Sequence, residues 1–222
     1  MLSNFRAGSA PSGRQRVEMR IDPKKLEEYP LYLRPFFWNQ KRKYGAILDA
    51  ALLWGRAPKL FLGVAFLFGM IDRRRSPVPA RLRCLVSVRV AQLNGCGFCV
   101  DINSATSLKR GVSLEKLGAL SSWRGSDLFD AKEQAVLDYA EAVTTAANQV
   151  DDAQIDQLRK FFTDDGIVEL TGLIAFQNMS SKFNSALGVP PQGFCRIKPG
   201  ADGPRPKVAS RFAELNGLRG EP

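Results

Sequence analysis

The sequence predicts an all-α fold. Apolar side chains recur at the i, i+3, i+4 spacing of one helix face, as at Leu82, Leu85 and Val86. Residues that begin or end helices are spread along the chain, and no stretch shows the sustained alternation of a strand. The chain has 222 residues, 45% hydrophobic and 24% charged, which is long enough and apolar enough for one sizeable globular domain.

The first half of the chain contains three predicted helices. Pro58 suits the first turn of a helix, and Gly69 lies near the end of the same helix. The next helix is expected to begin at Ser76-Pro77 and to run through residues 81–93. A third helix carries a Cys-x-x-Cys pair, and we expect Gly111 to end it.

Capping residues predict four more helices in the second half. Asp130 and Glu133 form an acidic capping box, and the helix that they begin is expected to reach about Ala147. The last and longest helix is expected to end at Gly188, which Pro190-Pro191 follows. The four helix starts are Ser113, Asp130, Asp151-Asp152 and Asp164-Asp165.

The composition divides the chain into one domain with two tails. Residues 1–20 and 196–222 are rich in proline, glycine and charge, so we expect flexible tails around a helical domain of residues 21–195. Each tail carries a net charge of +3, so only +4 of the net charge of +10 lies on the domain. Such a mild surplus does not indicate nucleic-acid binding. The aromatic and basic stretch 30–44 is instead expected to be a helix whose rings face the core or a subunit interface.

The sequence also predicts a cytoplasmic protein without a membrane span. No secretory signal is visible in the N-terminal tail, and four unevenly spaced cysteines do not form a secreted disulfide framework. The longest apolar run, residues 60–71, is shorter than the about 20 residues that cross a bilayer as a helix. The same cysteine spacing argues against a zinc site, so we expect no metal and no cofactor.

The most informative motif is Cys96-Gly-Phe-Cys99 at the start of a predicted helix. Cysteines at i and i+3 share a helix face, and the helix N-terminus favours a thiolate. A thiolate can attack a peroxide or a disulfide, after which the second thiol closes an intramolecular disulfide. Asn103 shares the face of Cys99 and can donate a hydrogen bond to a sulfur anion, but it cannot transfer a proton. The simpler interpretation is a pair of buried, unreactive thiols.

The region around this motif resembles the carboxymuconolactone decarboxylase family, and within it the alkylhydroperoxidase D-like proteins. The matching residues are an amphipathic helix at 85–91, then Asn94, Cys96 and Cys99, then Gly111-Val112-Ser113. The resemblance covers roughly residues 25–195 and is strongest in residues 81–120. It implies an all-α alkylhydroperoxidase D-like helical bundle that assembles into homo-oligomers, as trimers or hexamers.

The resemblance also assigns roles to the two cysteines. It implies that Cys99 attacks a peroxide and that Cys96 resolves the product, whereas the helix end favours Cys96 as the more acidic thiol. The glutamate and histidine of the family's proton relay are replaced by Cys84 and Asn103, and the chain contains no histidine. Cys84 is either a third thiol that relays the disulfide or a small apolar residue of the core.

Two carboxylates, Asp101 and Glu169, are candidates to replace the missing relay. Asp101 points to a different side of the helix from Cys99, so we expect it to be solvated or salt-bridged. An acid from another helix, such as Glu169, could supply the proton. The polar stretch from Phe176 to Asn184 is expected to line a pocket beside the cysteines, to bond between subunits, or to form an exposed helix face.

The sequence therefore predicts a thiol-dependent peroxidase or thiol–disulfide oxidoreductase that cycles Cys96 and Cys99 between dithiol and disulfide. Its substrate would be a small hydroperoxide or a disulfide, and a thiol would reduce it. The alternative is a non-catalytic oligomeric binding or scaffold protein that keeps the fold.

Overall fold

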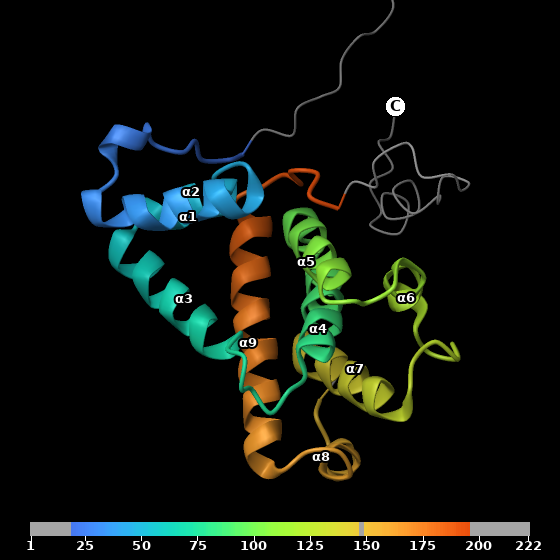
Figure 1. Ribbon diagram of the computed structural model, residues 1–222. Helices are drawn as coiled ribbons and strands as arrows, with labels where there is room; N and C mark the ends of the chain where they lie inside the picture. Colours follow the sequence, from blue (N-terminus) through green and yellow to red (C-terminus); the bar gives the residue numbers. More distant parts are fainter. Residues whose placement is uncertain (1–18, 147–148, 196–222) are drawn as a thin grey trace, which may run out of the picture.

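The computed structural model describes residues 19–146 and 149–195, and all of its regular elements in these ranges are helices (Figure 1). Short 3₁₀ turns at 26–28 and 31–33 precede the first α-helix, and another at 120–122 follows the sixth. The α-helices are α1 Arg34–Tyr44, α2 Asp49–Gly55, α3 Pro58–Ile71, α4 Ala80–Leu93, α5 Gly97–Lys109, α6 Leu114–Ala119, α7 Ala131–Thr144, α8 Asp152–Arg159 and α9 Asp164–Ala186.

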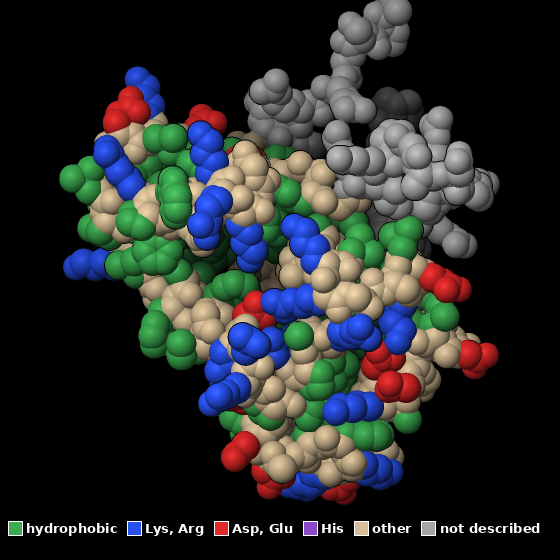
Figure 2. Space-filling view, in the orientation of Figure 1, with side chains coloured by type: hydrophobic (Ala, Val, Ile, Leu, Met, Phe, Trp, Pro, Cys, Tyr) green, Lys and Arg blue, Asp and Glu red, His purple; other side chains and the backbone are tan. Residues whose placement is uncertain are grey.

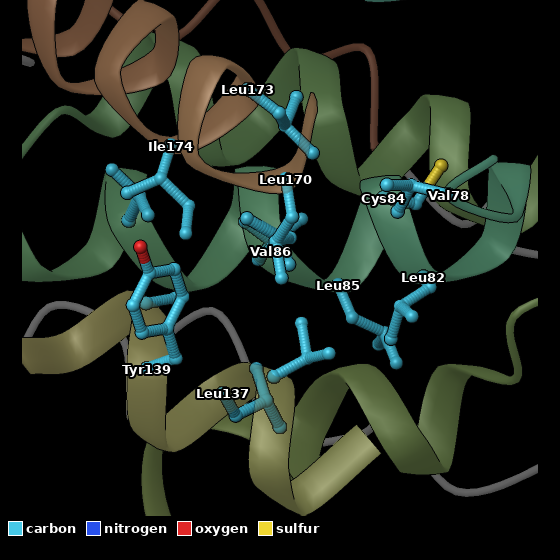
Figure 3. Close-up of a cluster of buried hydrophobic side chains, with 14 of the residues drawn as sticks. Val78, Leu82, Cys84, Leu85, Val86, Leu137, Tyr139, Leu170, Leu173 and Ile174 are labelled. Carbon is cyan, nitrogen blue, oxygen red and sulfur yellow. The ribbon is translucent and has the colours of Figure 1, made fainter. Parts of the chain in front are cut away.

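Helix α4 is the centre of the bundle, because α5, α7 and α9 all pack against it. Its apolar stripe, including Leu85 and Val86, is fully buried against α7 and α9. Figure 3 shows this cluster, with Leu137 of α7 and Leu170 of α9 directed towards α4. Because α4 is fixed from three sides, the turn that follows it and carries the cysteine pair is held in a rigid position.

A second hydrophobic cluster surrounds the cysteine pair. It joins α1 and α2 to the start of α5, through buried side chains such as Leu33, Phe37 and Trp54. Cys96 and Cys99 belong to this cluster and not to the one around α4. Figure 1 shows α1, α2 and α3 on one side of the long helix α9, and α4 and α5 on the other.

Most predicted capping residues act as expected. Asp130 and Glu133 form a capping box at α7, Ser113 caps α6, and Asp151 caps α8. Glycines at two helix ends, Gly111 and Gly188, have the left-handed φ values of +80° and +69° that favour glycine.

Two predicted boundaries are wrong. Helix α4 begins at Ala80 and not at Ser76-Pro77. Its N-cap is Pro79, which has an extended ψ of 143°, and a proline also favours extended backbone at the residue before it, here Val78. Helix α7 ends at Thr144, since Thr145 is extended and its hydroxyl donates to the carbonyl of Glu141; Ala147 lies outside the described residues. Helix α9 begins at Asp164, as predicted, and the hydroxyl of Thr163 caps it by accepting Gly166 N–H.

The predicted tails lie mostly outside the described residues. Arg20, which the sequence places in the first tail, donates from Nη1 to the carbonyls of Ser185 and Ala186 at 2.9 and 2.7 Å. It therefore satisfies free carbonyl groups at the C-terminal end of α9.

Within the described part of the chain, no helix has both the length and the hydrophobicity to span a bilayer. The aromatic stretch 30–44 forms α1 and divides its rings between two environments. Phe37 is buried in the second cluster, whereas Trp38 is 63% exposed.

Candidate active site

The cysteine pair lies at the turn between α4 and α5. Gly95, with a φ of +61°, reverses the chain after α4, and Cys96 N–H then bonds back to the carbonyl of Ala91 at 3.0 Å. Cys96 is the N-cap of α5, and its sulfur accepts the backbone N–H of Cys99 at 3.3 Å. The predicted placement at a helix start is therefore found, and the sulfur of Cys96 occupies the position of a capping oxygen.

Cys99 lies one turn further along α5 and faces a cavity. Both thiols are free, and they are only 1% (Cys96) and 3% (Cys99) exposed. The cavity has a volume of about 370 Å³, within the range of small-molecule sites, and Cys99 lines it whereas Cys96 does not. A molecule in the cavity thus meets Cys99 before Cys96.

The cavity is bounded by α1, α2 and α3 on one side and by α4, α5 and α9 on the other. Its wall is largely aromatic and aliphatic. The exposed side chains of Phe36, Lys43 and Phe68 belong to its lining, so the cavity reaches the surface. Figure 2 shows a hollow on this face, with Lys and Arg side chains around it. Apolar lining residues include Leu48, Trp54, Phe61, Val64, Phe98, Ile102, Leu173 and Phe176.

A polar stripe of α5 runs along the cavity floor. Cys99, Asn103, Thr106 and Arg110 all line it, at the i, i+4, i+7, i+11 spacing of one helix face. Eleven residues of helix rise by about 16 Å, so Cys99 and Arg110 lie at opposite ends of the cavity floor.

The end at Arg110 carries an ion cluster. Arg110 binds both carboxylate oxygens of Asp72, at 2.8 and 2.6 Å, and Arg83 donates to the same carboxylate at 3.3 Å. Cys84 lies beside this cluster, 3.8 Å from Arg110 Nη1. Burial raises the pKa of the Cys84 thiol, although Arg110 partly offsets it.

Cys84 therefore has features of both interpretations in the sequence. It belongs to the buried cluster around α4 and also lines the cavity, with its sulfur directed away from Leu82 and Leu85 (Figure 3). Its partners are Ser107 and Arg110, which lie about 12–16 Å along α5 from Cys99. A disulfide needs Cα atoms within about 7 Å, so Cys84 cannot exchange directly with Cys99 in this conformation.

The other side of Cys99 faces two amides of α9. Asn184 Nδ2 donates to the Cys99 sulfur at 3.3 Å, and Asn103 Nδ2 donates to Gln177 Oε1 at 3.3 Å. Gln177 and Asn184 are 6% and 1% exposed, and both line the cavity. Among the described residues, Asn103 thus donates its hydrogen bond to Gln177 and not to the Cys99 sulfur.

The two thiols differ in acidity. A hydrogen bond from the Cys99 thiol lowers the pKa of Cys96, as do the backbone N–H groups of Cys99 and Phe98, and together they outweigh burial. The same thiol–thiol hydrogen bond, burial and repulsion from Cys96 raise the pKa of Cys99. The amide of Asn184, which donates to the sulfur, and the amide of Gln177, whose Nε2 makes no hydrogen bond to it, lower the pKa of Cys99 but do not compensate. The first proton therefore leaves Cys96.

Asp101 and Glu169 both lie outside the cavity lining and have other roles. Asp101 is half-buried and binds backbone N–H groups, where the sequence predicts a solvated or salt-bridged side chain. It accepts the backbone N–H groups of residues 192–195, at 2.6 to 3.1 Å, because the chain after α9 turns back over the first turn of α5. Glu169 is paired with Arg73 and Ser76 and does not line the cavity.

Sequence reasoning missed the partner of Cys99 but found its region. The sequence leaves three roles open for the stretch from Phe176 to Asn184. The first of them, lining a pocket beside the cysteines, is found, because Gln177, Ser180 and Asn184 line the cavity. The signal was a set of amides within an otherwise apolar helix. The opposite members, Asn178 and Ser181, accept hydrogen bonds from Asn94 at 2.8 Å and so join α9 to the cysteine turn.

No metal site is found in the described ranges, 19–146 and 149–195, since no three Cys, Asp or Glu side chains there come close enough to hold an ion. The site thus consists of two neighbouring thiols, one cavity and a set of amides.

Comparisons with known proteins agree with this architecture. The model of the carboxymuconolactone decarboxylase family matches residues 62–142. The chain is 44% identical over 172 residues to the uncharacterized protein YnjA of Escherichia coli (strain K12), which covers 78% of this chain and 94% of YnjA.

Two solved structures share the fold at low sequence identity. One is an uncharacterized peroxidase-related protein from Silicibacter sp. TM1040, with a TM-score of 0.73, 19% identity and coverage of 81% of this chain and 96% of that one. The other is an alkylhydroperoxidase AhpD core protein from Ralstonia eutropha JMP134, also peroxidase-related, with a TM-score of 0.70, 20% identity and coverage of 79% and 94%. The chain therefore belongs to the carboxymuconolactone decarboxylase family and has the helical fold of its alkylhydroperoxidase D-like members.

Proposed function

We propose that the protein is a thiol-dependent peroxidase or thiol–disulfide oxidoreductase that uses Cys96 and Cys99. The observation that carries this proposal is the placement of Cys99, which lines a cavity of about 370 Å³ and is hydrogen-bonded to a second, more acidic thiol. Membership of a family with alkylhydroperoxidase D-like structures supports it.

The chain contains no histidine, so another group must transfer protons at the site. The neighbouring thiol, Cys96, does so. Cys96, as the thiolate, accepts the proton of Cys99. The Cys99 thiolate attacks the outer oxygen of a hydroperoxide, the O–O bond breaks, and the alkoxide takes the proton of Cys96 to leave as an alcohol. Cys99 is then a sulfenic acid.

The second step closes the disulfide. The Cys96 thiolate attacks the sulfur of Cys99, the S–O bond breaks, and hydroxide leaves and is protonated to water. Two thiols and one hydroperoxide thus give one disulfide, one alcohol and one water. A thiol reductant restores the dithiol. With a disulfide as substrate, the same pair passes through a mixed disulfide and releases two thiols.

The test is consumption of a small hydroperoxide, and of a disulfide dye, by the reduced protein. Wild type is expected to consume one or both, and Cys99→Ser and Cys96→Ser are expected to lose the turnover. If wild type consumes neither substrate faster than these variants, the enzyme proposal fails and the non-catalytic binding or scaffold function becomes the better account.

A further inference from the structure

Two buried polar atoms of α9, on side chains near the Cys99 sulfur, have no hydrogen-bond partner within the described part of the chain. Gln177 Nε2 and Asn184 Oδ1 have no hydrogen-bond partner among the described residues, although both side chains are more than nine-tenths buried and both line the cavity. A buried polar atom without a partner costs about 1–3 kcal/mol. Two such atoms in one cavity, next to one thiol, indicate a binding position for a polar group.

The remaining bonds of both amides fix their orientation. Gln177 Oε1 accepts from Asn103, and Asn184 Nδ2 donates to the sulfur of Cys99, each at 3.3 Å. The free atoms are therefore one N–H donor, on Gln177, and one carbonyl acceptor, on Asn184. The group that fits them has both a donor hydrogen and an acceptor oxygen.

We propose that Gln177 and Asn184 bind the peroxy group of the substrate. This inference rests on the proposed peroxidase function. A hydroperoxide has one O–H donor on its outer oxygen and an acceptor at its inner oxygen. Asn184 Oδ1 accepts the O–H, which places the outer oxygen at the sulfur that Asn184 Nδ2 holds. Gln177 Nε2 donates to the inner oxygen, which becomes the alkoxide.

Gln177 thereby stabilises the charge that develops in the reaction. When the Cys99 sulfur bonds to the outer oxygen, the O–O electron pair moves to the inner oxygen, and the Gln177 N–H is already directed at that atom. The amide transfers no proton; that proton comes from Cys96. A fixed donor of this kind acts as in an oxyanion hole, where the loss of one donor costs about 10²–10³ in rate.

The experiment uses the variant Gln177→Met, which keeps the volume of the side chain but removes the donor. Single-turnover oxidation of Cys99 by tert-butyl hydroperoxide is expected to slow by about 10². Oxidation by peracetic acid is expected to slow much less, because its leaving carboxylate is already a weak base. Labelling of Cys99 by methyl methanethiosulfonate needs no alkoxide, so it is expected to slow only by the small loss of thiolate that follows when the Gln177 amide no longer lowers the pKa of Cys99.

The matched control is Gln157→Met, which makes the same substitution at an exposed residue of α8 that does not line the cavity. It is expected to behave as wild type with all three reagents. Gln177→Leu, which also removes the donor and adds no charge, is expected to show the same selective loss if Gln177→Met does not fold.

Each outcome separates the inference from the function on which it rests. Equal rates for wild type and Gln177→Met with tert-butyl hydroperoxide would overturn the role of Gln177 and leave the cysteine cycle intact. An equal loss with all three reagents would show a merely structural role and also overturn it. If wild type shows no Cys99-dependent oxidation by any peroxide, both the inference and the peroxidase function fall.

Discussion

At Cys99, the neighbours that favour a thiolate can be separated from those that oppose it. Two amides of α9 favour the anion, whereas burial and the sulfur of Cys96 oppose it more strongly. Cys96 has the opposite balance because its sulfur accepts a hydrogen bond from the Cys99 thiol and also faces the N–H groups at the start of α5. The pair therefore divides two tasks: Cys96 holds the charge and Cys99 faces the cavity.

This division predicts different pH dependences for the two thiols. Alkylation follows the thiolate fraction, which rises as pH rises through the pKa. In Cys99→Ser, which keeps a donor for Cys96, alkylation of Cys96 is expected to reach half its plateau below the usual pH of about 8.5. In Cys96→Ser, alkylation of Cys99 is expected to reach half its plateau above a pH of about 8.5.

The measurement is the rate of iodoacetamide labelling, with each cysteine followed by peptide mass spectrometry from pH 5 to 11. The signals of Cys84 and Cys195 provide internal references, because burial raises the pKa of both thiols. A midpoint for Cys99 below that for Cys96 would contradict the assignment of the acidic thiol.

At the scale of elements, the chain after α9 covers the cysteine turn. Asp101 binds the N–H groups of residues 192–195, and a Cβ added at Gly97 would lie only 3.1 Å from Pro191. Val189 belongs to the same buried cluster as Cys96. The covering segment thus contributes to the burial of Cys96, and one carboxylate accepts four of its backbone N–H groups.

We expect Asp101→Ala to expose Cys96 without damaging the cavity. Hydrogen bonds to a charged group contribute about 1.5–3 kcal/mol each, and 1.4 kcal/mol is a factor of ten in an equilibrium. Labelling of Cys96 by a bulky maleimide is therefore expected to accelerate at least roughly tenfold. The control is Glu115→Ala, an exposed carboxylate at the start of α6, which should change nothing. An unchanged rate in Asp101→Ala would show that residues 192–195 do not limit access.

Another carboxylate, Glu141 of α7, joins α4 to the turn before α7. It is 6% exposed and binds Arg89 at 2.7 Å, Trp123 Nε1 at 2.7 Å, and Arg124. These donors lower its pKa against the opposing effect of burial. The carboxylate therefore stabilises the fold above its unfolded pKa of about 4.3, and this stabilisation is lost as pH falls through the lower folded pKa.

We expect Glu141→Gln to lower the free energy of unfolding at pH 7 by about 2 kcal/mol. This is less than the 3–5 kcal/mol typical of a broken buried pair, because Arg124 is half exposed. Urea unfolding at pH 7 and pH 3.5 measures the free energy of unfolding of both proteins, and the difference between Glu141→Gln and wild type should shrink at the lower pH. A difference that stays constant between the two pH values would contradict the electrostatic explanation.

The elements show where sequence reasoning succeeds and where it stops. Caps such as Asp130 and Ser113 act through bonds within a few residues, so the pattern predicts them. The contacts of Asp101 and Asn184 join residues about 90 positions apart, and no local pattern encodes them. The cysteine turn was predictable because its chemistry is local; its environment was not, because α9 and the chain after it provide it.

At the scale of the whole molecule, α3 carries an apolar face that the described residues leave open. Leu62, Phe66 and Met70 follow the i, i+4, i+8 spacing of one helix face and are 37%, 69% and 48% exposed. Figure 1 shows α3 at the edge of the bundle, on the far side of α9 from α4. We propose that this face packs against another copy of the chain in a homo-oligomer, a trimer or a hexamer.

The substitution Phe66→Asp places a charge in this face and is expected to give monomers. Light scattering coupled to size exclusion measures the mass, and circular dichroism checks that the helices remain. Val168→Asp, at an exposed apolar residue of α9 (70% exposed), is the comparison and should leave the mass unchanged. A wild type that is already monomeric at micromolar concentration would contradict the proposed assembly.

The central claim is that Cys96 and Cys99 form and break one disulfide. Reduced protein is treated with one equivalent of hydroperoxide, blocked with an alkylating reagent, digested and examined by mass spectrometry. We predict a cross-link between the Cys96 and Cys99 positions, with Cys84 and Cys195 alkylated, and full recovery of two free thiols after reduction. If both cysteines remain alkylatable after oxidation, or if the cross-link joins a different pair, the proposed cycle is wrong.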